Sequence, residues 1–211
     1  MIRAVIWDLD GTLIDSYRCI VPSLRQFYEE QGLALEEKDI RSAVLRGSVR
    51  EFAEAVRQQT GISLDAGMGR YREIRTEQEQ ALAPMPGARA VLDALAAAGV
   101  PSFLYTHRGE TTAAVLERTG LAGTFREIVT AESGFPRKPA PDALLYLIRR
   151  HSLSPAETCY VGDRQLDMDC AGAAGIRGIL FAPPGSEHPV SGPYARISDL
   201  RELLARIEKD K

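Results

Sequence analysis

The hydrophobic residues of this chain follow two repeating patterns that alternate over most of its length. Short apolar runs, such as residues 4–7 and 101–105, have the length and composition of buried strands. Longer segments, such as residues 88–98 and 140–151, carry apolar residues at helical spacing. Because strands that alternate with helices form parallel sheets covered on both faces, we predict an α/β fold built on a doubly wound parallel sheet.

The other elements of this alternating part follow the same two patterns. The strands are predicted at residues 4–7, 101–105, 127–130, 158–161 and 178–181. The helices are predicted at residues 88–98, 110–119, 140–151, 165–174 and 198–208. Gly99, Gly120 and Gly175 follow three of these helices, as glycine commonly does at a helix C-terminus.

Residues 16–82 depart from the alternation because no strand signal interrupts them. Apolar residues at helical spacing predict helices at residues 17–31, 35–46, 49–60 and 66–82. Ser48 stands three residues before Glu51, which is the spacing of a capping box at a helix N-terminus. We therefore predict two domains: a Rossmann-like core formed by residues 1–15 and 83–211, and an inserted α-helical cap formed by residues 16–82.

The segment after the first predicted strand contains two carboxylates, Asp8 and Asp10, followed by Gly11. Residues i and i+2 of an extended chain point to the same side, so the two carboxylates should face one space. Gly11 permits a sharp turn directly after them. One carboxylate of such a pair can act as a nucleophile while the other transfers protons. Taken alone, a pair of this kind favours a solvated turn after the strand, so a catalytic interpretation depends on the rest of the chain.

Further polar residues lie at or near the ends of other predicted strands. Thr106 follows the strand at 101–105, and Asp163 follows the strand at 158–161. Ligands of open α/β sheets bind outside the carboxyl ends of the strands. We therefore expect Thr106 and Asp163 to converge with Asp8 and Asp10 on one site.

Three motifs in this order resemble those of the haloacid dehalogenase-like superfamily. They are D-x-D-G-T from Asp8, K-P-x-P-D from Lys138 and G-D-x-x-x-D around Asp163. Together they extend from Asp8 to about Gly175, which is nearly the whole chain. The chain resembles the branch with an α-helical cap, which includes phosphoglycolate phosphatases and β-phosphoglucomutases. The resemblance implies a phosphatase that hydrolyses a small phosphate monoester through an aspartyl-phosphate intermediate.

The resemblance also implies a role for each catalytic residue. Asp8 would attack phosphorus, and Asp10 would protonate the leaving oxygen and then deprotonate the attacking water. Thr106 would donate a hydrogen bond to the phosphoryl group. Lys138 would neutralise the phosphoryl charge and steady Asp8. In this scheme the protein contributes mainly positioning and electrostatic stabilisation.

Charge favours a metal ion at the same site. Asp8, Asp10, Asp163 and Asp167 would bring four formal negative charges together, and a phosphate monoester adds more. A hard divalent cation such as Mg²⁺ takes oxygen ligands and would offset part of this charge, as would the Lys138 ammonium. By resemblance, Mg²⁺ would be held by the carboxylates of Asp8 and Asp163 and by the main-chain carbonyl of Asp10. Asp167 would orient Lys138 or a metal-bound water.

Three more residues are candidate substrate contacts. His107 stands where many relatives carry Asn, and it could contact substrate or cap the helix expected near Glu110. Arg46 and Arg50 flank a loop that faces the leaving group in the resembled proteins. They would suit a carboxylate-bearing ester such as phosphoglycolate. Both arginines could equally belong to a solvated helix face.

The alternative functions differ in what they require of the motif residues. A β-phosphoglucomutase-like phosphomutase typically has a His in the first cap helix, where this chain has Ile20. The dehalogenases of the superfamily need no metal and lack the second aspartate of the first motif, which is Asp10 here. A non-catalytic binding protein of this fold would be expected to have lost motif residues. The motif carboxylates and the lysine are all present, which favours an enzyme.

Composition narrows the expected partners and location. A net charge of −3, from 26 basic and 29 acidic residues, gives no broad cationic surface, so nucleic acid is not expected as a partner. No apolar segment approaches the roughly 18 residues needed to span a bilayer, and no signal-peptide pattern is seen, so we predict a cytoplasmic protein. The expected partner is a small phosphorylated metabolite. We expect a monomer or a homodimer.

The cysteines and the remaining histidines carry no predicted chemistry. Cys19, Cys159 and Cys170 lack C-x-x-C spacing, so neither a disulfide framework nor a zinc site is indicated. We expect Cys159 in a strand and the other two in helices. His151 and His188 are predicted to be surface residues.

Overall fold

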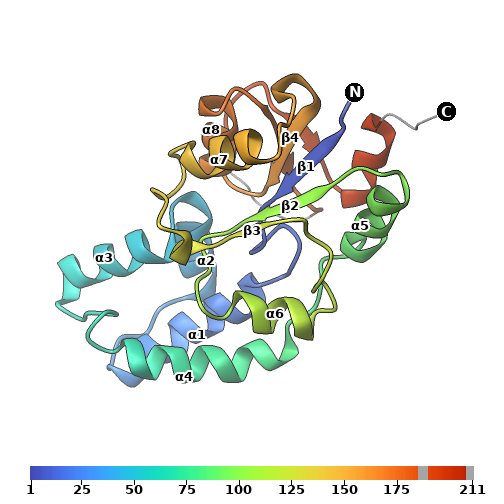
Figure 1. Cartoon of the computed structure of the whole chain (residues 1–211). Helices are drawn as coiled ribbons and strands as arrows, with labels where there is room; N and C mark the ends of the chain where they lie inside the picture. Colours follow the sequence, from blue (N-terminus) through green and yellow to red (C-terminus); the bar gives the residue numbers. More distant parts are fainter. Residues whose placement is uncertain (185–189, 208–211) are drawn as a thin grey trace. The chain divides into compact units, whose positions relative to one another are not determined.

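Six parallel strands form one sheet in the order β3-β2-β1-β4-β5-β6 (Figure 1). The computed structural model describes residues 1–184 and 190–207 of the chain. The strands are β1 (Ala4–Trp7), β2 (Ser102–Tyr105), β3 (Ile128–Val129), β4 (Thr158–Gly162), β5 (Arg177–Phe181) and β6 (Ala195–Ile197). The strand order runs outward from β1 in both directions, which confirms the predicted doubly wound α/β fold.

The order reverses beside β1, which pairs with β2 on one side and with β4 on the other. In this register Ile6 lies between Phe103 and Tyr160. The carboxyl ends of β1 and β4 are therefore neighbours at the topological switch point. Open α/β sheets bind their ligands at this point.

Helices connect the strands and bury the sheet. They are α5 (Ala88–Ala97), α6 (Thr112–Arg118), α7 (Asp142–Arg150) and α8 (Gln165–Ala173), with 3₁₀ helices η2 (Ala131–Ser133), η3 (Pro155–Glu157) and η4 (Leu200–Arg206). Ile6 and Phe103 share a hydrophobic cluster with Leu144 and Leu147 of α7. Trp7, which alternates with Ile6, is also fully buried, and its indole nitrogen donates a hydrogen bond of 3.2 Å to Ser102.

Two predictions near the C-terminus are wrong. β6 was not predicted, because three residues are too few to display an alternating pattern. The α-helix predicted at residues 198–208 is instead the 3₁₀ helix η4, and residue 208 lies outside the described residues. Asp199 sets the start of η4, because its carboxylate accepts a hydrogen bond of 2.8 Å from the Arg201 N–H.

Contacts between Cα atoms divide the chain into two compact units. Among the described residues, the first unit contains residues 1–14, 83–184 and 190–207 and holds the sheet. The second unit contains residues 15–82 and is helical. Its elements are α1 (Tyr17–Glu30), α2 (Glu37–Arg46), α3 (Val49–Thr60), α4 (Met68–Gln78) and the 3₁₀ helix η1 (Glu79–Ala81). Whether the helical unit acts as a cap stays a prediction.

The helical unit has its own hydrophobic core. Leu24, Ile40 and Ile74 are fully buried in it. The ring of Phe27 packs edge-on against the ring of Tyr28, with centroids 5.1 Å apart. The side chain of Ser48 accepts a hydrogen bond from the Glu51 N–H, which is the Ser48 half of the predicted capping box at the start of α3.

The cysteines and the membrane prediction are also clarified by the structure. Cys19, Cys159 and Cys170 are buried and lie in α1, β4 and α8 respectively, which are the element types predicted for them. Within residues 1–184 and 190–207, no helix combines the length and the hydrophobicity that a membrane span requires.

Candidate active site

Asp8 follows β1 and lies at the switch point of the sheet. Its N–H donates a hydrogen bond of 2.8 Å to the Val161 carbonyl, so the main chain at Asp8 still pairs with β4. Three residues later the chain turns sharply at Gly11, whose φ is 86°. Glycine reaches this left-handed region without steric cost. The Asp8 residue is 1% exposed at the edge of the sheet.

A buried chain of ion pairs links Asp8 to Lys138 and Asp167. The Lys138 Nζ lies 2.6 Å from Asp8 Oδ1 and 2.8 Å from Asp167 Oδ1. The side chains of these residues are at most 2% exposed. The structure thus brings together residues from three separate motifs, and Asp8 and Lys138 are 130 positions apart in the sequence.

Two aromatic rings complete the surroundings of the Lys138 ammonium. Its Nζ lies 4.8 Å from the ring centroid of Tyr105 and 5.1 Å from that of Tyr160. Both distances fall within the range of cation–π attraction. The Tyr160 hydroxyl donates a hydrogen bond of 3.2 Å to Asp167 Oδ1, and the Arg164 N–H donates one of 3.0 Å to Asp167 Oδ2. Both oxygens of Asp167 are therefore engaged.

These contacts set the protonation states of the three residues. Burial raises the pKa of Asp8 to about 6, although the Lys138 ammonium opposes the shift. Burial alone would lower the pKa of Lys138, but Asp167 and Asp8 raise it above its usual value. Burial alone would raise the pKa of Asp167, but Lys138 and Arg164 lower it. Near neutral pH, Lys138 is therefore an ammonium and Asp167 a carboxylate.

The carboxylates of Asp8, Asp163 and Asp167 form a candidate metal site. Each offers an oxygen atom, and these atoms lie within 4.8 Å of one another. Asp8 Oδ2 is buried and accepts no hydrogen bond within residues 1–184 and 190–207. A buried acceptor without a partner is costly, and a hard cation with oxygen ligands would satisfy it. The hydroxyl of Thr12 donates a hydrogen bond of 3.2 Å to Asp163 Oδ1 and orients that carboxylate.

Asp10 has a partner that sequence reasoning missed, Arg108. The guanidinium Nη2 lies 2.5 Å from Asp10 Oδ1, and Nε lies 3.2 Å from Oδ2, so the pair is bidentate. The Arg108 side chain is 5% exposed and that of Asp10 is 21% exposed. A sequence signal did exist, because Arg108 lies two residues after Thr106 at the same strand end.

Thr106 lies at the end of β2 and is 1% exposed. Its N–H donates a hydrogen bond of 3.0 Å to the Val129 carbonyl, which extends the pairing of β2 with β3. Its Oγ1 accepts a hydrogen bond of 3.1 Å from the Arg108 N–H. The hydroxyl hydrogen of Thr106 remains able to donate to another group.

His107 lies among different neighbours from those predicted. Its Nε2 accepts a hydrogen bond of 2.9 Å from the Lys138 N–H. The following helix, α6, begins at Thr112, so His107 does not cap a helix near Glu110. Burial lowers the pKa of His107 to about 3, with further lowering by the charges of Lys138 and Arg137. The ring is therefore neutral.

Of the remaining predicted residues, two belong to the helical unit, one belongs to the sheet unit and one lies outside the described residues. Arg46 and Arg50 belong to the helical unit and are exposed, and Arg46 Nη1 donates a hydrogen bond of 2.5 Å to Ser42 Oγ. Their contact with substrate stays a prediction. His151 is not a surface residue, because its side chain is 13% exposed and its Nε2 lies 2.6 Å from Glu127 Oε2. His188 lies outside the described residues.

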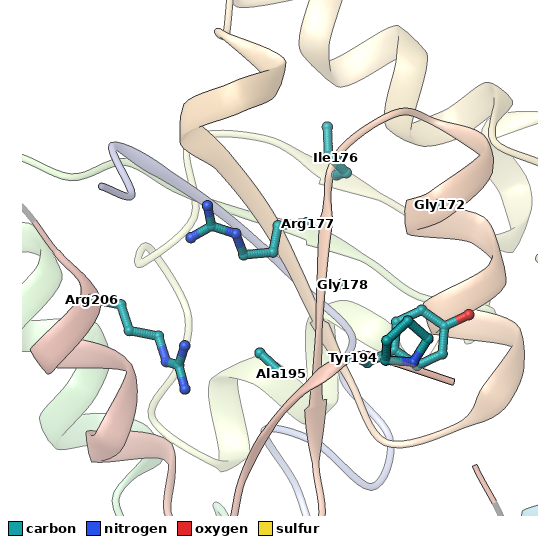
Figure 2. A pocket seen from close by; sticks show the side chains of 8 residues that line it. Gly172, Ile176, Arg177, Gly178, Tyr194, Ala195 and Arg206 are labelled. Carbon is teal, nitrogen blue, oxygen red and sulfur yellow. The ribbon is translucent and has the colours of Figure 1, made fainter. Parts of the chain in front are cut away.

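A hollow of about 370 Å³ lies elsewhere on the sheet unit (Figure 2). Arg177, the first residue of β5, lines it together with Tyr194 and Arg206. The hollow therefore opens near the amino ends of β5 and β6, whereas Asp8 and Asp163 follow the carboxyl ends of β1 and β4. It includes none of the predicted catalytic residues, so we do not assign the chemistry to it.

Comparison with known proteins agrees with this arrangement. The profile of the haloacid dehalogenase-like hydrolase family matches residues 5–181. The phosphoglycolate phosphatase of Rhodospirillum rubrum is 31% identical over 216 residues, covering 96% of this chain and 90% of that protein. A HAD-superfamily hydrolase from Geobacter sulfurreducens has a TM-score of 0.70 at 27% identity, covering 98% of this chain and 100% of that one. A HAD family hydrolase from Deinococcus radiodurans, solved with bound phosphate and sodium, has a TM-score of 0.76 at 23% identity. The match covers 97% of this chain and 96% of that one. The chain belongs to the haloacid dehalogenase-like hydrolases.

Proposed function

We propose that the protein is a Mg²⁺-dependent phosphatase that hydrolyses a small phosphate monoester through an aspartyl-phosphate intermediate. The observation that carries the proposal is the buried Asp8–Lys138–Asp167 chain, in which Asp8 Oδ2 lacks a hydrogen-bond partner among the described residues. Asp8 Oδ1 is held by Lys138, so Asp8 Oδ2 is the oxygen that remains open to a cation or to phosphorus. The similarity to a phosphoglycolate phosphatase over most of both chains supports the same reaction class.

The reaction divides into two displacements at phosphorus. In the first, an oxygen of Asp8 bonds to phosphorus while the bond from phosphorus to the ester oxygen breaks. Asp10 gives that ester oxygen a proton, and the alcohol leaves. In the second, water attacks phosphorus and passes a proton to Asp10 while the bond to Asp8 breaks. Inorganic phosphate leaves, and both aspartates return to their starting states.

Arg108 orients Asp10 for its part in these steps. A bidentate guanidinium pair fixes both oxygens of a carboxylate in one plane. The pair suits the second displacement, in which Asp10 must be ionised to accept a proton from water. In the first displacement Asp10 must carry a proton, so we propose that the Arg108–Asp10 pair loosens when substrate enters.

Lys138 and Thr106 would act on the phosphoryl group itself. The raised pKa of Lys138 keeps a full positive charge beside Asp8, where the phosphoryl oxygens would gather negative charge. Thr106 Oγ1 already accepts from the Arg108 N–H, which leaves its hydrogen free for a phosphoryl oxygen. Asp167 would hold Lys138 in place through the 2.8 Å contact with its ammonium.

The residues present fit a magnesium ion. We propose that the carboxylates of Asp8 and Asp163 and the main-chain carbonyl of Asp10 hold it. Because both oxygens of Asp167 are engaged, we assign Asp167 to Lys138 in preference to the metal. When bound, the ion supplies positive charge that offsets the carboxylates and the phosphoryl group.

A small ester with an anionic leaving group is the substrate class that we propose, with phosphoglycolate as the first candidate. The relative from Rhodospirillum rubrum supports this choice, and Arg46 and Arg50 are the proposed leaving-group contacts. No described feature favours a phosphomutase. Ile20 has no titratable group and is buried within the helical unit.

Phosphate release from a panel of small monoesters tests this proposal. We expect Mg²⁺-dependent turnover that excess chelator abolishes and added Mg²⁺ restores, with Ca²⁺ a poor substitute because it accepts looser geometry. The Asp8→Asn variant tests the nucleophile, since asparagine is nearly isosteric with aspartate but lacks its negative charge. We expect it to fold normally and to retain less than a few per cent of turnover. Undiminished activity in chelator or in Asp8→Asn would overturn the proposal.

A further inference from the structure

The main chain at Lys138 is held by a side chain from a different motif. Residues 134–141 contain no regular helix or strand, so secondary structure does not fix the position of Lys138. Its N–H donates a hydrogen bond of 2.9 Å to Nε2 of His107. At the other end of the same residue, Nζ contacts Asp8 and Asp167. Lys138 is thus tied at its main chain as well as at its ammonium.

We propose that His107 is a positioning residue that places the Lys138 ammonium between Asp8 and Asp167. The lysine side chain is a flexible four-carbon stem, so its ammonium can reach a defined point only when its Cα is fixed. His107 lies two residues after the end of β2, and the intervening Thr106 still pairs with β3, so the sheet supports the position of the ring. This inference rests on the proposed function for its kinetic consequences, but its structural part can be tested without activity.

The electrostatic surroundings keep His107 in the form that this role requires. Only a neutral imidazole offers an acceptor nitrogen, and here that nitrogen must be Nε2 with the proton on Nδ1. Burial and the neighbouring charges of Lys138, Arg137 and Arg164 all disfavour the imidazolium, with Asp167 as the opposing charge. The acceptor is thus maintained at every pH at which the enzyme is expected to work.

A purely packing role is the competing interpretation. The ring of His107 lies edge-on to that of Tyr105, with centroids 5.8 Å apart and an interplanar angle of 79°. The Tyr105 ring in turn lies beside the Lys138 ammonium. A bulky ring at position 107 could therefore support Lys138 through Tyr105 alone, without any hydrogen bond.

Two substitutions separate these interpretations. His107→Phe keeps an aromatic ring beside Tyr105 but removes the acceptor, whereas His107→Gln removes the ring but places an amide oxygen close to the position of Nε2. We expect His107→Phe to lower kcat about tenfold or more, because a buried N–H loses its partner, with little change in KM. We expect His107→Gln to retain kcat within about threefold. Equal activity of wild type and His107→Phe, or equal losses in both variants, would overturn the proposal.

Nitrogen-15 NMR tests the contact independently of turnover. We expect Nε2 of His107 to remain unprotonated from pH 5 to 8, and the Lys138 amide resonance to shift in His107→Phe but much less in His107→Gln. A protonated Nε2, or a Lys138 amide that ignores both substitutions, would contradict the hydrogen bond. If the wild type proved inactive on all esters while these spectra behaved as expected, the proposed function would fail and the positioning contact would stand.

Discussion

At the scale of single residues, the charged side chains of this site are buried together and depend on one another. Burial disfavours the charged form of any ionisable group, yet Lys138 remains an ammonium because Asp8 and Asp167 flank it. Removing one partner of a buried ion pair leaves an uncompensated charge, which typically costs about 3–5 kcal/mol. Substitutions in this cluster should therefore affect stability as well as catalysis, and the two effects have to be measured separately.

Arg108 is the residue whose role is easiest to isolate, because it touches Asp10 without belonging to the Lys138 chain. We expect Arg108→Ala to lower kcat about ten- to a hundredfold, because Asp10 loses the bidentate pair that orients it. Arg108→Lys keeps the positive charge but not the fork, so we expect its kcat to lie closer to Arg108→Ala than to wild type. Steady-state kinetics on one ester measures kcat for Arg108→Ala and Arg108→Lys. Wild-type kcat in Arg108→Ala would refute the proposed role.

His107 should make stability depend on pH in a defined direction. Its pKa is about 3 in the folded state and close to the ordinary 6.5 when unfolded, so the unfolded state binds more protons between these values. The contribution of His107 is therefore complete above pH 6.5 and is lost as the pH falls toward 3. Between pH 7 and 5 we expect it to lower the free energy of unfolding of wild type by about 2 kcal/mol relative to His107→Gln. Urea unfolding at both pH values measures this difference, and identical pH dependence in both proteins would contradict it.

Residue identity predicted much of the site but not its connections. Asp8, Lys138 and Asp167 could be selected because their motifs are distinctive and follow strand ends. The Arg108–Asp10 pair and the His107–Lys138 hydrogen bond join positions 98 and 31 residues apart. No periodicity or local spacing encodes such contacts, since they depend on how neighbouring strand ends and loops pack in three dimensions.

At the scale of elements, the turn from β4 into α8 places two of the site carboxylates. Asp163 follows the last residue of β4, and Asp167 lies in the first turn of α8. The Arg164 N–H donates to Asp167 Oδ2, so Asp167 also closes the start of its own helix. One side chain thereby serves the helix terminus and Lys138 together, which explains the tight spacing of the motif.

Gly162 is required by this turn. A Cβ atom added at Gly162 would lie 2.4 Å from Asp167 Cβ and 2.5 Å from Asp167 Cγ, so Asp167 would have to move. We expect Gly162→Ala to lower the free energy of unfolding by about 1–3 kcal/mol and to reduce kcat. Gly172→Ala in α8 is the matched control, because its added Cβ meets nothing within 4 Å and should stabilise the helix by up to about 1 kcal/mol. Urea unfolding measures the stability of both variants, and steady-state kinetics measures their kcat. A Gly162→Ala variant as stable and active as wild type would disprove the steric argument.

Element prediction succeeded where periodicity was long enough to be distinctive. The helices α1, α2 and α3 have clear helical patterns of apolar residues, and the strand preceding Asp8 is a continuous apolar run. β6 was not predicted because Ala195–Ile197 includes Arg196. This residue is exposed on an edge strand and interrupts any apolar run. The α-helix predicted at residues 198–208 is wrong because apolar spacing alone does not distinguish a 3₁₀ helix from an α-helix in a short segment.

At the scale of the whole molecule, the helical unit is inserted directly after the first motif. The chain leaves the sheet unit after Ile14 and returns at residue 83. The two connections lie side by side, because the Met85 N–H donates a hydrogen bond of 2.8 Å to the Leu13 carbonyl and Ile14 pairs with Pro84. An insertion whose ends meet leaves the surrounding fold undisturbed. The two connections join the helical unit to the segment that carries Asp8 and Asp10.

Arg50 tests whether the helical unit contributes to substrate specificity. If it binds an anionic leaving group, Arg50→Ala should lower kcat/KM for phosphoglycolate about ten- to a hundredfold, the value of one charge-assisted hydrogen bond, while sparing a neutral aryl phosphate. Hydrolysis of the aspartyl-phosphate should be unchanged, because the leaving group has already departed. Arg57→Ala is the matched control on the same helix, since Arg57 is exposed and paired with Glu54. Parallel losses on both esters would assign Arg50 a structural role, and no loss on either would place it on a solvated face.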